Sequence, residues 1–175
     1  MNKLEELNNR SKQLIIEKEE HPSQKETEKH IKNVQNFGNI LVKEIEKRLK
    51  EHDQSKLEDP EIKYFDDNAG KLKDLTYGSK EYKQELENLK PALNHHYKAN
   101  RHHPEHYKDG IKEMTLIDLL EMIIDWKSAT LRHKVGDIIE SIKKNQKRFG
   151  YSDELKQIFL NIVKEFFGEK DKNGK

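Results

Sequence analysis

Apolar residues recur every three or four positions along much of this chain, a spacing that places them on one face of an α-helix. The clearest stripe lies in residues 23–51 and contains Ile31, Val34, Phe37, Leu41, Ile45 and Leu49. Residues 115–132 form the most apolar segment, and two further helices are expected at about 136–148 and 153–167. No convincing pair of strands is visible. We therefore predict an all-α fold, a single-domain bundle of six or seven helices.

Prolines, glycines and serines divide the chain between these segments. A weakly amphipathic helix is expected over residues 3–20, inside an N-terminal helical part that ends at residue 22. The main helical domain then spans residues 23–167, where Ser23 and Glu26 stand in the relation of a capping box. Residues 168–175 form a polar tail.

The middle of the main domain is harder to assign. Residues 53–78 contain Pro60, Gly70 and Gly78, and they predict an irregular connection with a short helical turn. Ser79 suits the cap of a helix that runs to about residue 90. Pro91 suits the first position of a further helix, which would carry a dense group of histidines.

Charge and composition limit the partners and the chemistry. The 34 basic and 33 acidic residues leave a formal charge of +1, so no net field attracts nucleic acid or a membrane surface. No apolar run is long enough to cross a bilayer, and the N-terminus lacks the core of a signal peptide. We expect a cytoplasmic protein, in a bacterium or in the host of a phage. The absence of cysteine excludes thiolate zinc sites, and neither a Gly-x-Ser-x-Gly elbow nor a glycine-rich phosphate loop is present.

Five of the nine histidines fall within residues 95–106, and a His52-Asp53 pair lies upstream. Imidazole and carboxylate are common ligands of transition metals, so this set predicts a metal-centred site. On a helix, Leu93, His96, Asn100 and His103 would share one face. His96 and His103 would then point inward, with His95 and His102 at their flanks.

Three carboxylates interrupt the most apolar helix. Asp118, Glu121 and Asp125 are spaced i, i+3 and i+7, and so lie on one stripe. Thr115 and Asp118 match a capping box, and Glu121 is equally suited to pairing with a basic neighbour. Asp125 lies in mid-helix, where no cap needs it, and is the first candidate for a metal ligand.

The order His30, His52-Asp53, histidine-rich segment and Asp125 resembles the HD superfamily of metal-dependent phosphohydrolases. His52-Asp53-x-x-Lys56 is similar to the variant found in HD-GYP phosphodiesterases, but the Gly-Tyr-Pro of that family is missing, so cleavage of cyclic dinucleotides is not implied. The chain more closely resembles a bacterial and phage family with no known reaction. The shared motifs are His-Asp-x-Ser-Lys, His-His-x-x-x-Asn-x-His-His and Glu-Met-x-x-Asp-Trp.

The HD resemblance implies an all-α HD-like domain that hydrolyses a nucleotide or another small phosphoester. It implies His30, His52, Asp53 and Asp125 as metal ligands, and His96 and His103 as ligands of a second ion if there is one. Asp53 would also orient the attacking water. The metal would be a divalent transition ion, with Mn, Fe, Co, Ni and Zn all suited to such ligands. The candidate contacts to substrate are Lys56, His95, Asn100, Arg101 and His102. Lys56 would also act in catalysis, where it or Arg101 would neutralise the charge that develops on the phosphate.

One geometric objection concerns His30. If residues 23–51 form one helix, His30 and His52 lie ~33 Å apart and cannot share an ion. Either the chain bends at Phe37-Gly38-Asn39, the sole local breaker, or it reverses within residues 43–51, or His30 is not a ligand.

Other functions also remain open at this stage. The same residue types suit a di-iron oxygenase, a module that sequesters a small ligand without turnover, or a structural metal clamp. A homo-oligomer is compatible with the sequence as well.

Overall fold

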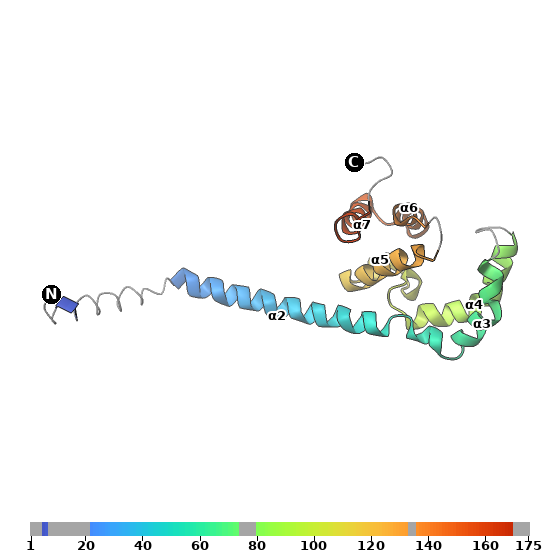
Figure 1. The fold of residues 1–175 in the computed structure, drawn as a ribbon, viewed down its shortest axis with the longest axis horizontal. Helices are drawn as coiled ribbons and strands as arrows, with labels where there is room; N and C mark the ends of the chain where they lie inside the picture. The colour runs from blue at the N-terminus through green and yellow to red at the C-terminus, as the bar shows by residue number, and fades with distance from the viewer. Residues whose placement is uncertain (1–4, 7–21, 74–79, 133–135, 170–175) are drawn as a thin grey trace. The chain divides into compact units, whose positions relative to one another are not determined.

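The computed structural model describes residues 5–6, 22–73, 80–132 and 136–169. In this part of the chain every regular element is a helix, with six α-helices and no strand, so the predicted all-α class is confirmed (Figure 1). Two compact units are distinguished, residues 1–44 and 45–175. Their boundary lies inside the first long helix, whereas we expected a division at residue 22.

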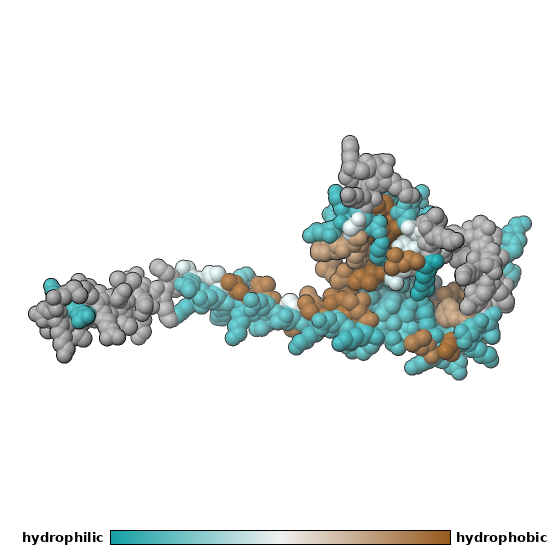
Figure 2. Space-filling view, in the orientation of Figure 1, coloured by the Kyte–Doolittle hydropathy of each residue, from teal (hydrophilic) through white to brown (hydrophobic). Residues whose placement is uncertain are grey.

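The first unit consists, where described, mainly of the long helix α2 (Pro22–Glu51), whose last seven residues belong to the second unit. The predicted apolar stripe is present, and Ile31, Val34 and Phe37 are all exposed along it. Figure 2 shows these apolar patches following the helix. Ser23 was predicted to cap this helix. Because α2 already begins at Pro22, Ser23 lies inside the helix instead.

The second unit shows that the prediction of an irregular connection over residues 53–78 is wrong for most of its length. A short 3₁₀ helix, η1 (Gln54–Leu57), follows α2, and α3 (Glu61–Lys73) follows η1. Gly70 lies inside α3. The helix packs against α4 (Lys80–Ala99) and η1, and these tertiary contacts outweigh its poor intrinsic helix propensity.

Helix α4 also differs from its prediction, since it continues through Pro91 where we expected a new helix to begin. Leu89 and Ala92, on either side of the proline, are both buried, and this packing keeps the helix continuous. The helix ends at Ala99, and the chain goes on through two 3₁₀ helices, η2 (Pro104–His106) and η3 (Gly110–Glu113). The histidine-rich segment is therefore only partly helical.

The last three helices match their predicted positions closely: α5 (Leu116–Thr130), α6 (Ile138–Phe149) and α7 (Asp153–Phe166). Thr115 and Asp118 form the predicted capping box, and Ser152 caps α7. These helices enclose a core made of Leu119, Met122, Ile123, Ile138, Ile142, Tyr151, Phe159 and Val163. Trp126 stacks on Phe149 beside this core, with ring centroids 6.3 Å apart. Helix α5 thus presents an apolar face to α6 and α7, which leaves its carboxylate stripe for another surface.

Some predictions fall outside the described residues. These are most of the helix expected over residues 3–20, the cap at Ser79 and the end of the tail, 170–175. In the part that is described, no helix combines the length and the apolar character needed to span a membrane.

Candidate metal centre

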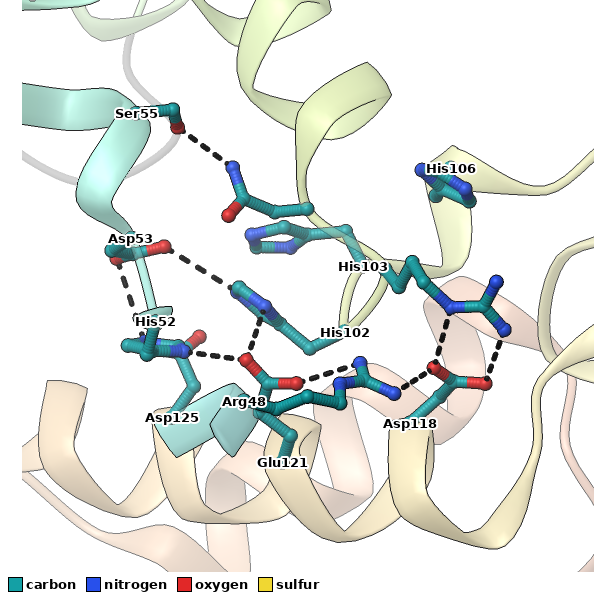
Figure 3. A network of polar contacts seen from close by, with 12 residues as sticks. Arg48, His52, Asp53, Ser55, His102, His103, His106, Asp118, Glu121 and Asp125 are labelled. Carbon is teal, nitrogen blue, oxygen red and sulfur yellow. Dashed lines mark hydrogen bonds and ion pairs between the residues drawn. The ribbon is translucent and has the colours of Figure 1, made fainter. Parts of the chain in front are cut away.

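Asp53 occupies the turn at which the chain leaves α2. Its backbone is left-handed, with φ 56° and ψ 15°, and it is the one non-glycine residue with positive φ in the described part of the chain. Aspartate tolerates this conformation better than most residues, but the backbone is still strained, and such strain is concentrated at functional sites. The side chain does not cap η1. Its carboxylate is therefore directed to the histidines of the neighbouring segments (Figure 3).

A first group of donors combines Asp53 with three histidines. One ligand atom from each of Asp53, His96, His102 and His103 lies within 4.8 Å of all the others. Asp53 Oδ1 lies 3.3 Å from His96 Nε2 and 3.5 Å from His102 Nε2. His96 Nε2 and His103 Nε2 are 2.8 Å apart. Four donors thus face one point from three separate segments.

Two atoms of this first group indicate that it is suited to binding a cation. Asp53 Oδ1 and His102 Nε2 are buried and have no hydrogen-bond partner. An unsatisfied buried polar atom costs roughly 1–3 kcal/mol, and a cation bound between the two would remove that cost. The donor set of imidazole and carboxylate fits a transition metal ion.

A second group shares Asp53 with the first. His52, Asp53 and Asp125 also offer ligand atoms within 4.8 Å of one another. His52 Nε2 lies 3.6 Å from Asp53 Oδ2 and 3.6 Å from Asp125 Oδ1. The two oxygens of Asp53 therefore face different partners, Oδ1 the first group and Oδ2 the second.

Buried carboxylates hold the other ring nitrogen of three of these histidines. Glu121 Oε1 is 2.9 Å from His52 Nδ1 and 3.0 Å from His102 Nδ1. Glu61, which is fully buried, places Oε2 2.9 Å from His96 Nδ1. When Nδ1 carries the proton and donates a hydrogen bond to the carboxylate, Nε2 keeps a free lone pair. This is how proteins orient metal-binding imidazoles. His52, His102 and Glu121 also form a third close group, but these hydrogen bonds explain it.

An arginine holds two of the buried carboxylates of α5 in place. Arg48, in the last turn of α2, lies with Nη1 2.5 Å from Asp118 Oδ1 and Nη2 2.6 Å from Glu121 Oε2. Asp118 also accepts from Arg101 Nε at 3.2 Å and from the Thr115 hydroxyl at 2.6 Å. Because both carboxylates are buried, this network of charged hydrogen bonds fixes the end of α2, residues 45–51, against α5 within the second unit.

The ionisation states of the carboxylates suit cation binding. Burial works to raise the pKa of Asp53, but the hydrogen bond and charge of Lys56 outweigh it and hold that pKa below its usual value. Burial also opposes ionisation of Glu121, whose pKa is nevertheless lowered to about 2 by hydrogen bonds from His102 and His52. For Asp125, the hydrogen bond from His52 likewise overcomes burial and lowers the pKa. All three are carboxylates at neutral pH.

The pKa values of His52, His96 and His103 are shifted in two opposite directions. Burial lowers the pKa of His96, and burial together with the neighbouring His102 and His96 lowers the pKa of His103 to about 3. These two rings are neutral, as ligands must be. Hydrogen bonds to Asp125 and Glu121 instead raise the pKa of His52 to about 9. Before it binds a metal, the His52 ring is therefore protonated on both nitrogens and positively charged at neutral pH.

Most of the predicted site residues come together in this centre, but one of them has a different position from the one predicted. His52, Asp53, His96, His103 and Asp125 all belong to a donor group. His102, which we predicted to flank the helix and contact substrate, is instead 1 % exposed and presents Nε2 to the first group. The prediction failed because α4 ends at Ala99, so helical phase does not extend to this residue.

The predicted substrate contacts lie around the donors. Lys56 Nζ is 2.5 Å from Asp53 Oδ2, and Asn100 donates from Nδ2 to Ser55 Oγ at 2.8 Å. His95 is about half-exposed and pairs through Nδ1 with Glu61 Oε1 at 2.7 Å. Arg101 is half-exposed and reaches Asp118.

His30 belongs to none of the donor groups. It is exposed on α2 within the first unit, and α2 is described throughout and does not reverse at Gly38. The reversal that its predicted role required is therefore missing from this helix.

Three residues of the centre were not predicted to belong to it from the sequence. Glu121 was noted, but as a partner for a basic residue, and it does pair with Arg48. Arg48 had a signal, since it is three residues after Ile45 and so places a charge on the apolar stripe of α2. Glu61 had none, because it lay in a segment that we expected to be irregular.

Comparison with known families adds one finding. Residues 19–168 match a family of unknown function, DUF5662. The chain belongs to this family. The matched residues include every member of the donor groups described above, and the family description gives no role for any of them. Comparisons with curated proteins and with solved structures find no match.

Proposed function

We propose that this protein is a metal-dependent phosphohydrolase with an HD-like centre, acting on a nucleotide or another small phosphoester. The observation that supports it best is the convergence of three imidazole Nε2 atoms on Asp53. Three histidines of the centre, His52, His96 and His102, are braced by buried glutamates.

Asp53, His96, His102 and His103 would hold one divalent ion, and His52, Asp53 and Asp125 a second. A bound divalent ion acidifies a coordinated water and polarises a phosphoryl oxygen. Its identity, among Mn, Fe, Co, Ni and Zn, is a matter for metal analysis.

The chain's own residues would complete the reaction. The carboxylate of Asp53 orients the attacking water and balances the charge of the cations. Lys56, which is partly exposed beside Asp53, binds a phosphate oxygen and neutralises the charge that develops on it. Arg101, also exposed in part, supplies a second contact at the rim of the site.

The test is metal analysis of the purified protein followed by assays on a panel of phosphoesters with each ion. Asp53→Asn should lose bound metal and nearly all turnover. Its loss of affinity should exceed the ~10–100-fold that follows when a supporting carboxylate is removed. His30→Gln, a matched change outside the donor groups, should behave like the wild type. Full activity of Asp53→Asn, or metal-loaded protein that hydrolyses no phosphoester, would refute the proposal. Oxygen consumption by an iron-loaded sample would favour an oxygenase instead.

A further inference from the structure

The two donor groups around Asp53 differ in number and in burial. The first has four protein donors, and His96 and His102 are only 2 % and 1 % exposed. The second has three donors, and the side chains of His52 and Asp125 are 25 % and 21 % exposed. Closed sets of four protein ligands are typical of tightly held ions, whereas sets of three leave room for water or substrate.

The two oxygens of Asp53 are also in different situations. Oδ1, on the side of the first group, is buried and has no hydrogen-bond partner. Oδ2, on the side of the second group, already bears the Lys56 ammonium at 2.5 Å. A cation in the second group and the ammonium of Lys56 must therefore compete for the same oxygen. The first group meets no such competitor at Oδ1.

Electrostatics adds to this difference. Two divalent ions that share one carboxylate repel each other, so the second to arrive always binds more weakly. The group that fills second should be the one with fewer donors and with a resident positive charge. In this protein both properties belong to the group formed by His52, Asp53 and Asp125.

We propose that the centre takes up divalent cations in two unequal steps, and that Lys56 is the built-in competitor that weakens the second. The buried position fills first and stays filled. The open position exchanges with the surrounding pool, and when it fills, Lys56 releases Oδ2 and becomes available to an anionic ligand. The concentration of free divalent cation then regulates the site. This inference rests on the proposed function only in requiring cations at the same residues.

The experiment titrates the metal-free full-length protein with Co²⁺, followed by calorimetry and by the visible absorption of the bound ion. Wild-type protein should show two steps whose affinities differ at least ~10-fold. Lys56→Met keeps the length of the side chain and removes its charge. It should tighten the second step ~10-fold or more and leave the first unchanged. Lys56→Arg, which keeps the charge, should retain a weak second step.

Two further variants assign the steps to their ligands. Asp125→Asn should abolish the weak step alone, and His103→Gln should abolish the tight step, with circular dichroism showing that both remain helical. Equal affinities, a single ion per chain, or a Lys56→Met variant whose second step is unchanged or weaker would overturn the inference.

These outcomes are separable from those of the proposed function. Two unequal steps without any phosphoester hydrolysis would refute the hydrolase and support the inference. Hydrolysis by a protein that binds one ion would do the opposite.

Discussion

The two oxygens of Glu121 serve three other side chains. Oε1 accepts hydrogen bonds from both His52 and His102, and Oε2 accepts from Arg48. Because Glu121 is 3 % exposed, each of these bonds is protected from water. One buried carboxylate thus orients a ring from each donor group, and the charge it carries is part of the reason why His52 holds its proton.

The protonation of His52 leads to a prediction for the metal-free protein. The pKa of His52 is raised from 6.5 to about 9, so its proton stabilises the fold fully below pH 6.5. That contribution is lost as the pH rises through about 9. Titration of the His52 ring followed by NMR should give a midpoint near 9, and Asp125→Asn should lower it. Unfolding by urea should show stability falling over the same interval in the wild type and less so in His52→Gln. A ring that titrates near 6.5 would contradict the assignment.

At the scale of elements, the turn between α6 and α7 brings the two helices onto one core. Gly150 ends α6 with φ 66°, and its amide donates to the carbonyl of Gln146 at 2.8 Å. Ser152 then accepts from the amide of Leu155 and begins α7. Glycine adopts the left-handed conformation without a steric penalty, which is why helices so often end on it.

Replacement of this glycine should destabilise the protein. Gly150→Ala forces a Cβ into a left-handed residue, and we expect a loss of about 1–2 kcal/mol in the free energy of unfolding. Gly38→Ala is the matched control, because Gly38 lies inside α2 with nothing within 4 Å of an added Cβ. There, alanine should be neutral or stabilise the helix by up to about 1 kcal/mol. Chemical denaturation followed by circular dichroism measures both. Equal effects of the two substitutions would argue against the left-handed turn.

At the scale of the whole molecule, the second unit has two centres of cohesion, one on each side of α5. The apolar core joins α5 to α6 and α7. The polar centre joins α5 to the end of α2, to α4 and to the segment after α4. Since the donors are far apart in sequence, an ion bound by them binds the folded chain and not the unfolded one.

Divalent cations should therefore raise the melting temperature. At a free concentration of 100 times the Kd the gain is about 2.7 kcal/mol, equivalent to roughly 5–10 °C for a chain of this size. Thermal unfolding with Co²⁺ and with a chelator measures the shift. His30→Gln should show the full shift and Asp53→Asn almost none. If the cation stabilised Asp53→Asn as much as the wild type, it would be binding elsewhere.

The sequence by itself determined what depends on neighbours along the chain. The 3.6-residue period located α2, α5, α6 and α7, and the local chemistry of Thr115, Gly150 and Ser152 located their ends. Residue types alone also indicated that His52, Asp53 and Asp125 belong with the histidine-rich segment. These features can be predicted from the sequence because helix periodicity, capping and ligand chemistry are properties of short segments.

Only the tertiary structure decided which side chains meet. Packing against α4 makes α3 a helix, and it brings the buried Glu61 to His96. The end of α4 at Ala99 turns His102 inward, where helical phase had placed it at the flank. Arg48 of α2 and Glu121 of α5 meet although more than 70 positions separate these two residues in the sequence. Such contacts follow from how whole elements pack, because the energy of a buried charge depends on partners that the local sequence does not contain.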